Sequence, residues 1–321
     1  MSAPSPRLSV VICTHNPRKD FLARTLASLR AQTLPFTEWE LIVIDNASHE
    51  PLAPDAAGTG HPAAKVVLES EVGLTAARLR GISEARANLL VFVDDDNLLA
   101  PDYLACVREL SGAWPQLGVW GCGSYTPEWE VAPPAGYDEY IRYLAVHRAP
   151  RDYTSNRPFD YEAMPAGAGL CVRATIAQRY ADMVRNDPRR KLLGRTGGNL
   201  AGCEDFDLAL TATDLGLGTG VFTALAITHL MPRGRVEEDY LLRLIEGHTY
   251  STVLLMALRD PTLKPKPRSW LDWLHRQRLR RCLSPVQRRI HDACDRGSIR
   301  AWDLLRSIKP AHPKSAASIP S

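Results

Sequence analysis

Three adjacent carboxylates, Asp94, Asp95 and Asp96, end an apolar run at residues 89–93. Carboxylates this close repel one another, so a strand that ends in this way is expected to face a cation. Carboxylate oxygens at the mouth of a rigid strand suit Mg²⁺ or Mn²⁺, and such a metal commonly carries phosphates. An acidic loop, with an aspartate that caps the helix after Pro101, is the alternative interpretation of the triplet alone.

Strands that alternate with helices must position this triplet. Apolar, β-branched runs lie at residues 8–13, 39–44, 64–68 and 89–93, and helical patterns separate them. Continuous apolar runs of this kind are typical of a parallel sheet covered on both faces. Because ligands bind outside the carboxyl ends of such strands, we expect the polar residues at three strand ends to meet in one crevice. These residues are Thr14, His15, Asn16, Asp45, Asn46, Ser48 and those at 94–97.

The first strand is not followed by a glycine-rich phosphate loop. The sequence CTHNP at residues 13–17 replaces the G-x-G-x-x-G of a nicotinamide or flavin domain, and the chain has no Walker lysine loop. A nucleotide in this crevice would therefore be held by side chains and a metal. This pattern points to a sugar nucleotide.

Taken in order, these motifs resemble an inverting family 2 glycosyltransferase of the GT-A fold. The resemblance covers roughly residues 7–250 and rests on SVVICTHNP, ELIVIDNAS, GLTAARLRGISEA and LLVFVDDDN. It implies an α/β fold with a mostly parallel central sheet flanked by helices. It also implies transfer of a sugar from a nucleoside-diphosphate sugar to an acceptor hydroxyl. Uridine is the commonest donor base in that family, although the same contacts would serve guanosine or thymidine.

The resemblance assigns roles to the residues at the strand ends. Its nucleotide contacts fall on Thr14, Asn16, Asp45, Arg78, Asp94 and Asp95. The last residue of the D-x-D motif, Asp96, falls on a divalent metal, Mn²⁺ or Mg²⁺. Leu79 stands where asparagine is usual in the family, which removes one polar contact. Taken singly, these residues would also fit an ordinary turn, a strand end or a solvated helix face.

The segment GCEDFDL at residues 202–208 resembles the G-E-D-x-D-L segment of the family, with Cys203 beside the acidic pair. By this resemblance Asp205 is the general base, which takes the proton of the acceptor alcohol as that alcohol attacks the anomeric carbon. One base and one metal suffice for a single in-line displacement, so inversion at that carbon is expected. A helix start, whose dipole favours Glu204 and Asp205, is a compatible interpretation of the same residues.

Further candidates surround another apolar run, in AITHLMPRGR. His229 stands where the family often has a histidine near the metal or the diphosphate, and imidazole suits Mn²⁺ better than Mg²⁺. Arg233 and Arg235 are candidate diphosphate contacts, and Glu204 is a candidate for the diphosphate or the acceptor. The small residues at 164–173 are expected to line the sugar and acceptor cleft, because glycine permits close backbone approach. A structural histidine, a solvated loop and an ordinary turn are the alternatives.

The composition fits a cytoplasmic enzyme. The chain has 321 residues, of which 45% are hydrophobic, enough for one large core and a small second module. Its seven scattered cysteines predict reduced core thiols. No apolar leader precedes the first strand, and no run approaches the roughly 20 apolar residues that cross a bilayer. We expect the protein in the cytosol or at the inner face of the membrane.

The C-terminal part of the chain is basic. From residue 259 to residue 309 there are 14 Lys and Arg against 5 Asp and Glu, whereas the whole chain carries a net charge of +3. The expected parts are a catalytic domain at 1–258, a basic helical extension at 259–309 and a disordered tail at 310–321. The extension contains Trp270, Trp273 and Trp302. It fits attachment to an anionic membrane near a lipid-linked acceptor, or a helical bundle packed on the catalytic domain. Nucleic acid is not an expected partner, because no recognised binding fold supports it.

Two other functions fit parts of the pattern. A phosphotransferase of the haloacid dehalogenase type also has Asp-x-Asp after an apolar strand, but after its first strand and not its fourth. A catalytically degenerate sugar-nucleotide-binding or scaffolding protein should lack the base, and Asp205 is present. The sequence thus predicts a metal-dependent inverting glycosyltransferase of surface polysaccharide or glycolipid synthesis, with a glycan or lipid-linked acceptor.

Overall fold

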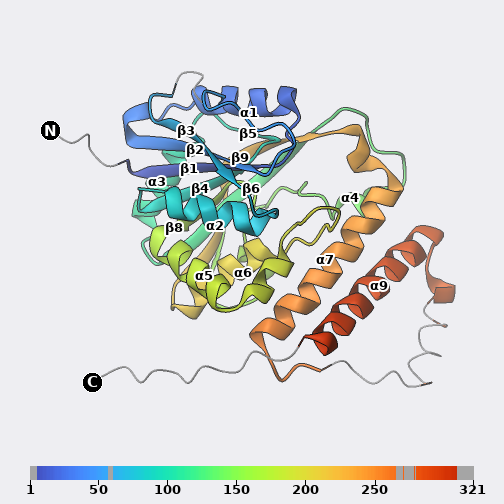
Figure 1. The fold of residues 1–321 in the computed structure, drawn as a ribbon. Coiled ribbons are helices and arrows are strands. Elements are labelled where there is room, and N and C mark those ends of the chain that lie inside the picture. The colour runs from blue at the N-terminus through green and yellow to red at the C-terminus, as the bar shows by residue number, and fades with distance from the viewer. Residues whose placement is uncertain (1–5, 57–60, 265–269, 271–277, 279, 309–321) are drawn as a thin grey trace, which may run out of the picture.

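A single sheet forms the centre of the molecule (Figure 1). The computed structural model describes residues 6–56, 61–264, 270, 278 and 280–308, and within them nine strands are joined in this sheet. The order is β3-β2-β1-β4-β8-β6-β9-β5, and β7 pairs with β9. The strands are β1 (Leu8–Thr14), β2 (Trp39–Asn46), β3 (Ala64–Glu69), β4 (Leu89–Asp94), β5 (Asn97–Leu99), β6 (Leu117–Trp129), β7 (Tyr153–Ser155), β8 (Leu170–Arg173) and β9 (Gly218–Met231).

The four strands predicted from the sequence are β1 to β4, and they are parallel neighbours. Their register places Thr14 beside Asp45, and Cys13 beside Asp94, so the polar strand ends lie at one edge of the sheet. The long pair of β6 and β9 is also parallel, whereas β5, β7 and β8 form short antiparallel pairs. The expected fold class, a mostly parallel sheet flanked by helices, is confirmed.

Helices cover both faces of the sheet, and most of them present apolar residues to it. The helices are α1 (Lys19–Arg30), α2 (Leu74–Glu84), α3 (Tyr103–Ala113), α4 (Asp138–Ile141), α5 (Ala174–Asn186), α6 (Glu204–Asp214), α7 (Glu238–Arg259) and α9 (Pro285–Ser307), with 3₁₀ turns η1 (Phe36–Glu38), η2 (Tyr161–Ala163), η3 (Pro188–Leu193) and η4 (Arg233–Val236). The core on one face includes residues of α1 and α3. The core on the other includes residues of α2, α5, α6 and α7.

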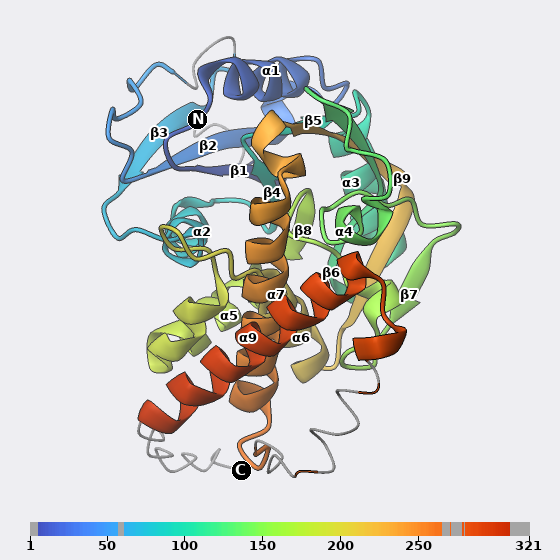
Figure 2. The same ribbon diagram turned by 90° about the vertical axis from the view of Figure 1, so that its right-hand side faces the viewer.

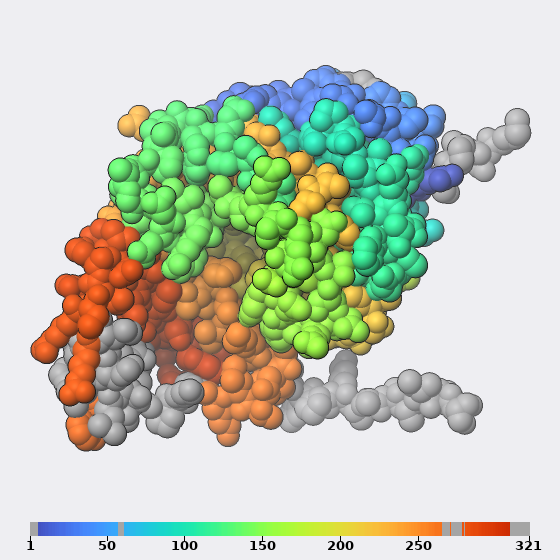
Figure 3. All heavy atoms as spheres, turned by 180° about the vertical axis from the view of Figure 1, so that it is seen from behind, coloured from blue at the N-terminus to red at the C-terminus, as the bar shows by residue number. Residues whose placement is uncertain are grey.

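The basic C-terminal region contributes a long helix, α9, which packs on α7 (Figure 2). Ile290 and Ala293 of α9 share a small core with Tyr140 of α4 and Leu241 of α7. The space-filling view shows α7 and α9 together at one side of the molecule (Figure 3). The expected helical extension is confirmed, and α9 takes the bundled arrangement. The predicted tail at 310–321 and Trp273 lie outside the described residues.

Two smaller predictions concern cysteines and membrane spans. All seven cysteines are free thiols, as expected, but Cys282 is exposed and is therefore not the core thiol that was predicted. In the part of the chain that the structure describes, no helix combines the length and the apolar character that crossing a bilayer requires. The division of the chain at residue 258 stays a prediction, although that residue falls one position before the end of α7.

Candidate active site

The carboxyl ends of β1, β2 and β4 open into one pocket of about 380 Å³. The strand-end residues that line it are Cys13, Thr14, His15, Asn46, Asp94, Asp95 and Asp96. Its other walls come from the start of α2, the segment at 166–168, the loop between η3 and α6, and His229 with Arg235. The prediction that three strand ends face one crevice is therefore confirmed, although four residues expected there do not line it, namely Asn16, Asp45, Ser48 and Asn97.

The acidic triplet concentrates negative charge on one wall of this pocket. Burial and the neighbouring Asp96 raise the pKa of Asp95 to about 7, although the Thr14 hydroxyl donates a hydrogen bond to its carboxylate. Burial and Asp96 also raise the pKa of Asp94. Since desolvation and like charges both oppose ionisation of these groups, a cation bound beside them would relieve the repulsion.

Asp96 faces the two cationic candidates of the downstream segment. Its Oδ2 lies 3.5 Å from His229 Nε2 and 3.4 Å from an Arg235 guanidinium nitrogen. Burial raises the pKa of Asp96, but His229 and Arg235 outweigh it, so the pKa is lowered. The other ring nitrogen of His229, Nδ1, lies 3.3 Å from the Ala145 carbonyl oxygen. Because a carbonyl only accepts, this contact favours a proton on Nδ1; Nε2, which faces Asp96, donates to it when the ring is protonated and is the nitrogen that a metal would take.

This pair of facing donor atoms fits a divalent metal. Carboxylate oxygen and imidazole nitrogen are both accepted by Mn²⁺. Among the residues that the structure describes, no three or more His, Cys, Asp or Glu side chains are grouped to hold an ion. A metal on Asp96 and His229 would therefore take its remaining ligands from substrate phosphates and water, as Mg²⁺ commonly does.

Asp205 lies in the first turn of α6, across the pocket from the triplet. The Gly167 amide donates to its Oδ2 at 2.8 Å, and the Phe206 amide donates to Oδ1 at the same distance. Two backbone donors thus fix a half-buried carboxylate that remains accessible from the pocket. As predicted, the small residues at 166–168 line the cleft. A Cβ at Gly167 would collide with the Arg78 guanidinium, so only glycine permits this approach.

Beside Asp205, Glu204 forms a buried ion pair with Arg78 at 3.1 Å. Burial and the neighbouring Asp205 raise the pKa of Glu204 to about 7, although the Arg78 guanidinium opposes this increase. Its second oxygen, Oε2, is buried without a hydrogen-bond partner. Arg78 therefore lines the pocket, as predicted, but its guanidinium is paired with Glu204. The sequence alone does not reveal this ion pair.

Three predicted site residues do not line this pocket. Asp45 is 1% exposed, and its two oxygens accept from the Ser48 and Leu52 amides at 3.2 and 2.7 Å. Asn16 has a left-handed backbone (φ 50°) and lines a separate hollow of about 630 Å³ between α1 and the loop after β2. Arg233 is exposed and does not line it either. Asp45 thus orders the loop after β2, and nucleotide contacts of these three residues stay predictions.

Sequence reasoning missed Arg195, which lines the pocket from the loop between η3 and α6. The signal that could have found it is the run GRTGGN at residues 194–199. Glycine-rich segments allow close approach of backbone to a ligand. Because no predicted strand adjoins this run, the sequence does not indicate that it lies near the acidic triplet.

Comparisons with known proteins show similarity to glycosyltransferases. The family described as "Glycosyl transferase family 2" matches residues 9–113. "Uncharacterized glycosyltransferase YwdF" of Bacillus subtilis (strain 168) is 32% identical over 98 residues, which are 30% of this chain and 35% of YwdF. EpsH of the same strain is 30% identical over 129 residues, 39% of this chain and 36% of EpsH. "Succinoglycan biosynthesis protein ExoW" of Rhizobium meliloti (strain 1021) is 32% identical over 103 residues, 30% of this chain and 32% of ExoW.

The chain thus spans about a third of the length of these relatives. The crystal structure of S. aureus TarS resembles it over 80% of this chain and 40% of TarS, with a TM-score of 0.50 and 14% sequence identity. At this identity the likeness concerns the fold alone. The matched segment contains β1 to β4 and the acidic triplet. Residues 9–113 of the chain therefore match glycosyl transferase family 2 and resemble its members in sequence.

Proposed function

We propose that this protein is a metal-dependent inverting glycosyltransferase, which moves a sugar from a nucleoside-diphosphate sugar to an acceptor hydroxyl. One observation carries the proposal: Asp205 and the acidic triplet line the same pocket, at the carboxyl ends of the family 2 strands. A carboxylate held by two backbone amides suits a base that must stay ionised and correctly aimed. Uridine diphosphate sugars are the first donor class to test.

In this proposal Asp205 removes the proton of the acceptor hydroxyl while that oxygen attacks the anomeric carbon. The nucleoside diphosphate leaves on the opposite side, which inverts the configuration at that carbon. Asp96 and His229 would hold the metal, which supplies positive charge for the departing diphosphate. Arg235, which bonds Asp96, is placed to contribute a further cation at the same end of the pocket.

The setting of the reaction is also part of the proposal. ExoW carries the name of a succinoglycan biosynthesis protein, and this supports a role in polysaccharide or glycolipid synthesis, with a glycan or lipid-linked acceptor. We infer a cytoplasmic protein that contacts the inner face of the membrane through its basic C-terminal region. Trp270, 70% exposed, is the described side chain that best suits such contact.

Calorimetric titration with uridine, guanosine and thymidine diphosphates, each with and without Mn²⁺, tests this function. Metal-dependent binding of one nucleotide is expected, and that nucleotide directs the screen for the donor sugar. Transfer to an acceptor, with inversion seen by NMR of the product, would then complete the assignment. If a nucleotide binds but no donor is turned over, the degenerate sugar-nucleotide-binding alternative is favoured. Absence of binding under both conditions would overturn the proposal.

A further inference from the structure

The pocket carries an excess of acidic side chains over arginines. Five carboxylates line it, at Asp94, Asp95, Asp96, Glu204 and Asp205, against three guanidinium groups, at Arg78, Arg195 and Arg235. A nucleoside diphosphate is itself an anion, and anions are repelled by uncompensated carboxylates. The site therefore needs cationic groups whose hydrogen-bond donors are free to meet phosphate oxygens.

Two of the three arginines are already committed to carboxylates. Arg78 is 3% exposed and bonds Glu204 at 3.1 Å, and Arg235 lies 3.4 Å from Asp96. Arg195 differs from both, since no carboxylate of the described residues lies within ion-pair distance of its guanidinium. Its fork of N–H groups is thus the one that can turn to a ligand without breaking an ion pair.

The surroundings of Arg195 are those of the metal end of the pocket. Desolvation lowers its pKa, but nearby acidic groups, among them Tyr240, Asp94 and Asp96, outweigh this effect, so the pKa is raised and the group stays charged. Tyr240 also packs under the Arg235 guanidinium, 5.3 Å from the ring centre. Arg195 and Arg235 therefore share both Tyr240 and Asp96 as neighbours.

The backbone around Arg195 is held in place on two sides. Its carbonyl oxygen accepts from the Leu74 amide, at the start of α2, at 2.9 Å. On the other side, the Asn199 side-chain oxygen accepts from the Arg300 guanidinium of α9 at 3.0 Å. The loop between η3 and α6 therefore lies between α2 and α7 (Figure 1), and hydrogen bonds join it to α2 and α9.

We propose that Arg195 binds the diphosphate of the donor nucleotide, at the end of the pocket where Asp96 and His229 would hold the metal. A guanidinium pairs with phosphate through two parallel N–H···O bonds, a geometry that an ammonium cannot copy. This inference rests on the proposed function. It adds to that function a residue that contacts the phosphates of the donor and not its nucleoside. Arg195 also stabilises the charge that develops on the leaving diphosphate.

The test compares Arg195→Ala with wild type in binding of two probes, a nucleoside diphosphate and the corresponding nucleoside, with Mn²⁺ present. Loss of a charge-assisted bidentate contact should weaken diphosphate binding roughly 10- to 100-fold and leave nucleoside binding unchanged. Arg195→Lys should recover only part of the loss. Arg185→Ala, which removes an exposed α5 arginine paired with Asp182, is the control and should bind as wild type does.

The other outcomes distinguish failure of the Arg195 role from failure of the proposed function. If wild type binds the diphosphate and Arg195→Ala binds it equally well, the role of Arg195 is wrong and the proposed function stands. An equal loss for both probes would indicate a structural effect on the loop, and would also refute a phosphate contact. If wild type binds no nucleoside diphosphate, both the inference and the proposed function fail.

Discussion

At the scale of single residues, the site depends on carboxylates with different surroundings. Asp205 is held by two amides, whereas Glu204 is buried with one oxygen unpartnered. The same helix start thus presents one carboxylate that remains accessible and one that resists ionisation. This contrast distinguishes Asp205, the proposed base, from Glu204, which pairs with Arg78.

Replacement of Asp205 by asparagine tests the base directly. Asp205→Asn keeps the size of the side chain but cannot accept a proton, so turnover should fall on the order of 10² to 10⁴ while donor binding persists. Steady-state rates with the identified donor, with calorimetric affinity alongside, provide the measurement. Asp182→Asn on the exposed face of α5 is the control. A variant that turns over at the wild-type rate would remove Asp205 from the mechanism.

The buried Glu204 should make stability depend on pH. Its pKa is raised from 4.5 to about 7 on folding, so between these values the folded chain keeps a proton that the unfolded chain has released. The free energy of unfolding should therefore fall as the pH rises through this window. Glu204→Gln removes this contribution, and the slope should change by up to about 1.4 kcal/mol per pH unit.

Urea denaturation of wild type and Glu204→Gln at several pH values measures the difference. Glu109→Gln, on α3 and outside the pocket, serves as the control for the loss of one carboxylate. Equal slopes for wild type and Glu204→Gln would show that Glu204 is ionised in the folded chain throughout the window.

Some site residues could be predicted from the sequence and others could not. The triplet, Thr14 and Asp205 line the pocket as expected, because strand ends and a helix start are legible in the sequence. Asp45 was assigned to the nucleotide, yet the structure engages both its oxygens with backbone amides of the following loop. Arg195 was missed, since a loop with no strand pattern gives no indication of the wall on which it lies.

At the scale of elements, the strands were easier to predict than their partners. The runs that form β1, β2 and β4 are mostly apolar because helices cover both faces of these strands, and this pattern is readable. The pairings of β8 with β4 and β6, and of β5 with β9, join segments far apart in the chain. Nothing local specifies such contacts, and they were not predicted.

The crossing of α7 and α9 depends on a glycine. A Cβ at Gly297 would collide with the Glu246 carbonyl oxygen of α7. Gly297→Ala should therefore lower the free energy of unfolding by roughly 1–3 kcal/mol, although alanine is the better helix former. Gly112→Ala on α3 meets no atom within 4 Å and should stabilise the protein or leave it unchanged. Denaturation midpoints measure the stability of both variants. Equal changes in the free energy of unfolding for the two variants would mean that α7 and α9 move apart easily to accept the added methyl group.

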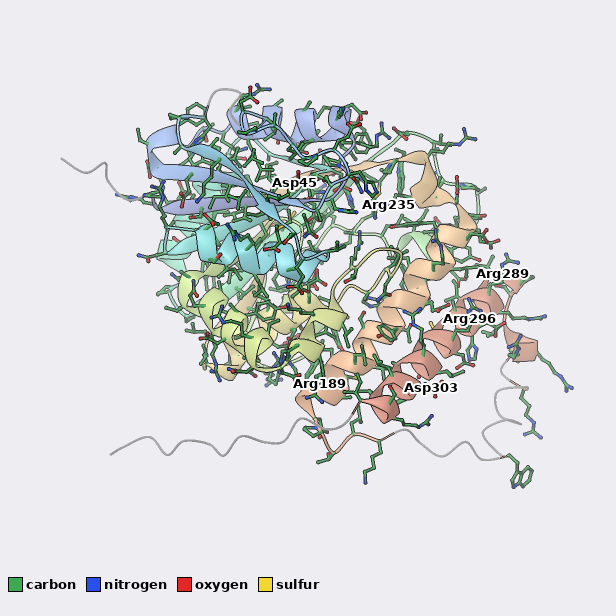
Figure 4. The ribbon with its side chains drawn as sticks, viewed as in Figure 1. Asp45, Arg189, Arg235, Arg289, Arg296 and Asp303 are labelled. Carbon is green, nitrogen blue, oxygen red and sulfur yellow. The ribbon has the colours of Figure 1, made fainter. Side chains whose placement is uncertain are left out.

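At the scale of the whole molecule, the basic C-terminal region is less free than its charge suggests. Arg289 and Arg296, which Figure 4 shows along α9, pair with Glu238 and Glu246 of α7. Part of the positive charge counted in the sequence is thus neutralised within the fold. Removal of the whole region would also uncover apolar surface of α7, so truncation is a poor test of membrane attachment.

A single exposed side chain gives a cleaner test of the proposed membrane contact. Wild type should sediment with vesicles that contain anionic lipid and much less with neutral vesicles. Trp270→Ser should weaken this binding roughly tenfold, because an exposed tryptophan that inserts at the interface is lost. Leu215→Ser, at a site 48% exposed after α6, is the control and should leave binding unchanged. Wild type that stays in the supernatant with both vesicle types would contradict the attachment.

The bond from Arg300 of α9 to Asn199 has a consequence for recombination between relatives. A chimera that exchanges the last helix alone would keep the family 2 segment intact and yet leave the Arg195 loop without its outer support. The loop at 194–202 also bonds α7, through the Gly202 amide and the Ser251 hydroxyl, and α7 packs on α9. We therefore expect a chimera that takes all three segments from one protein to be more stable than a chimera that exchanges α9 alone.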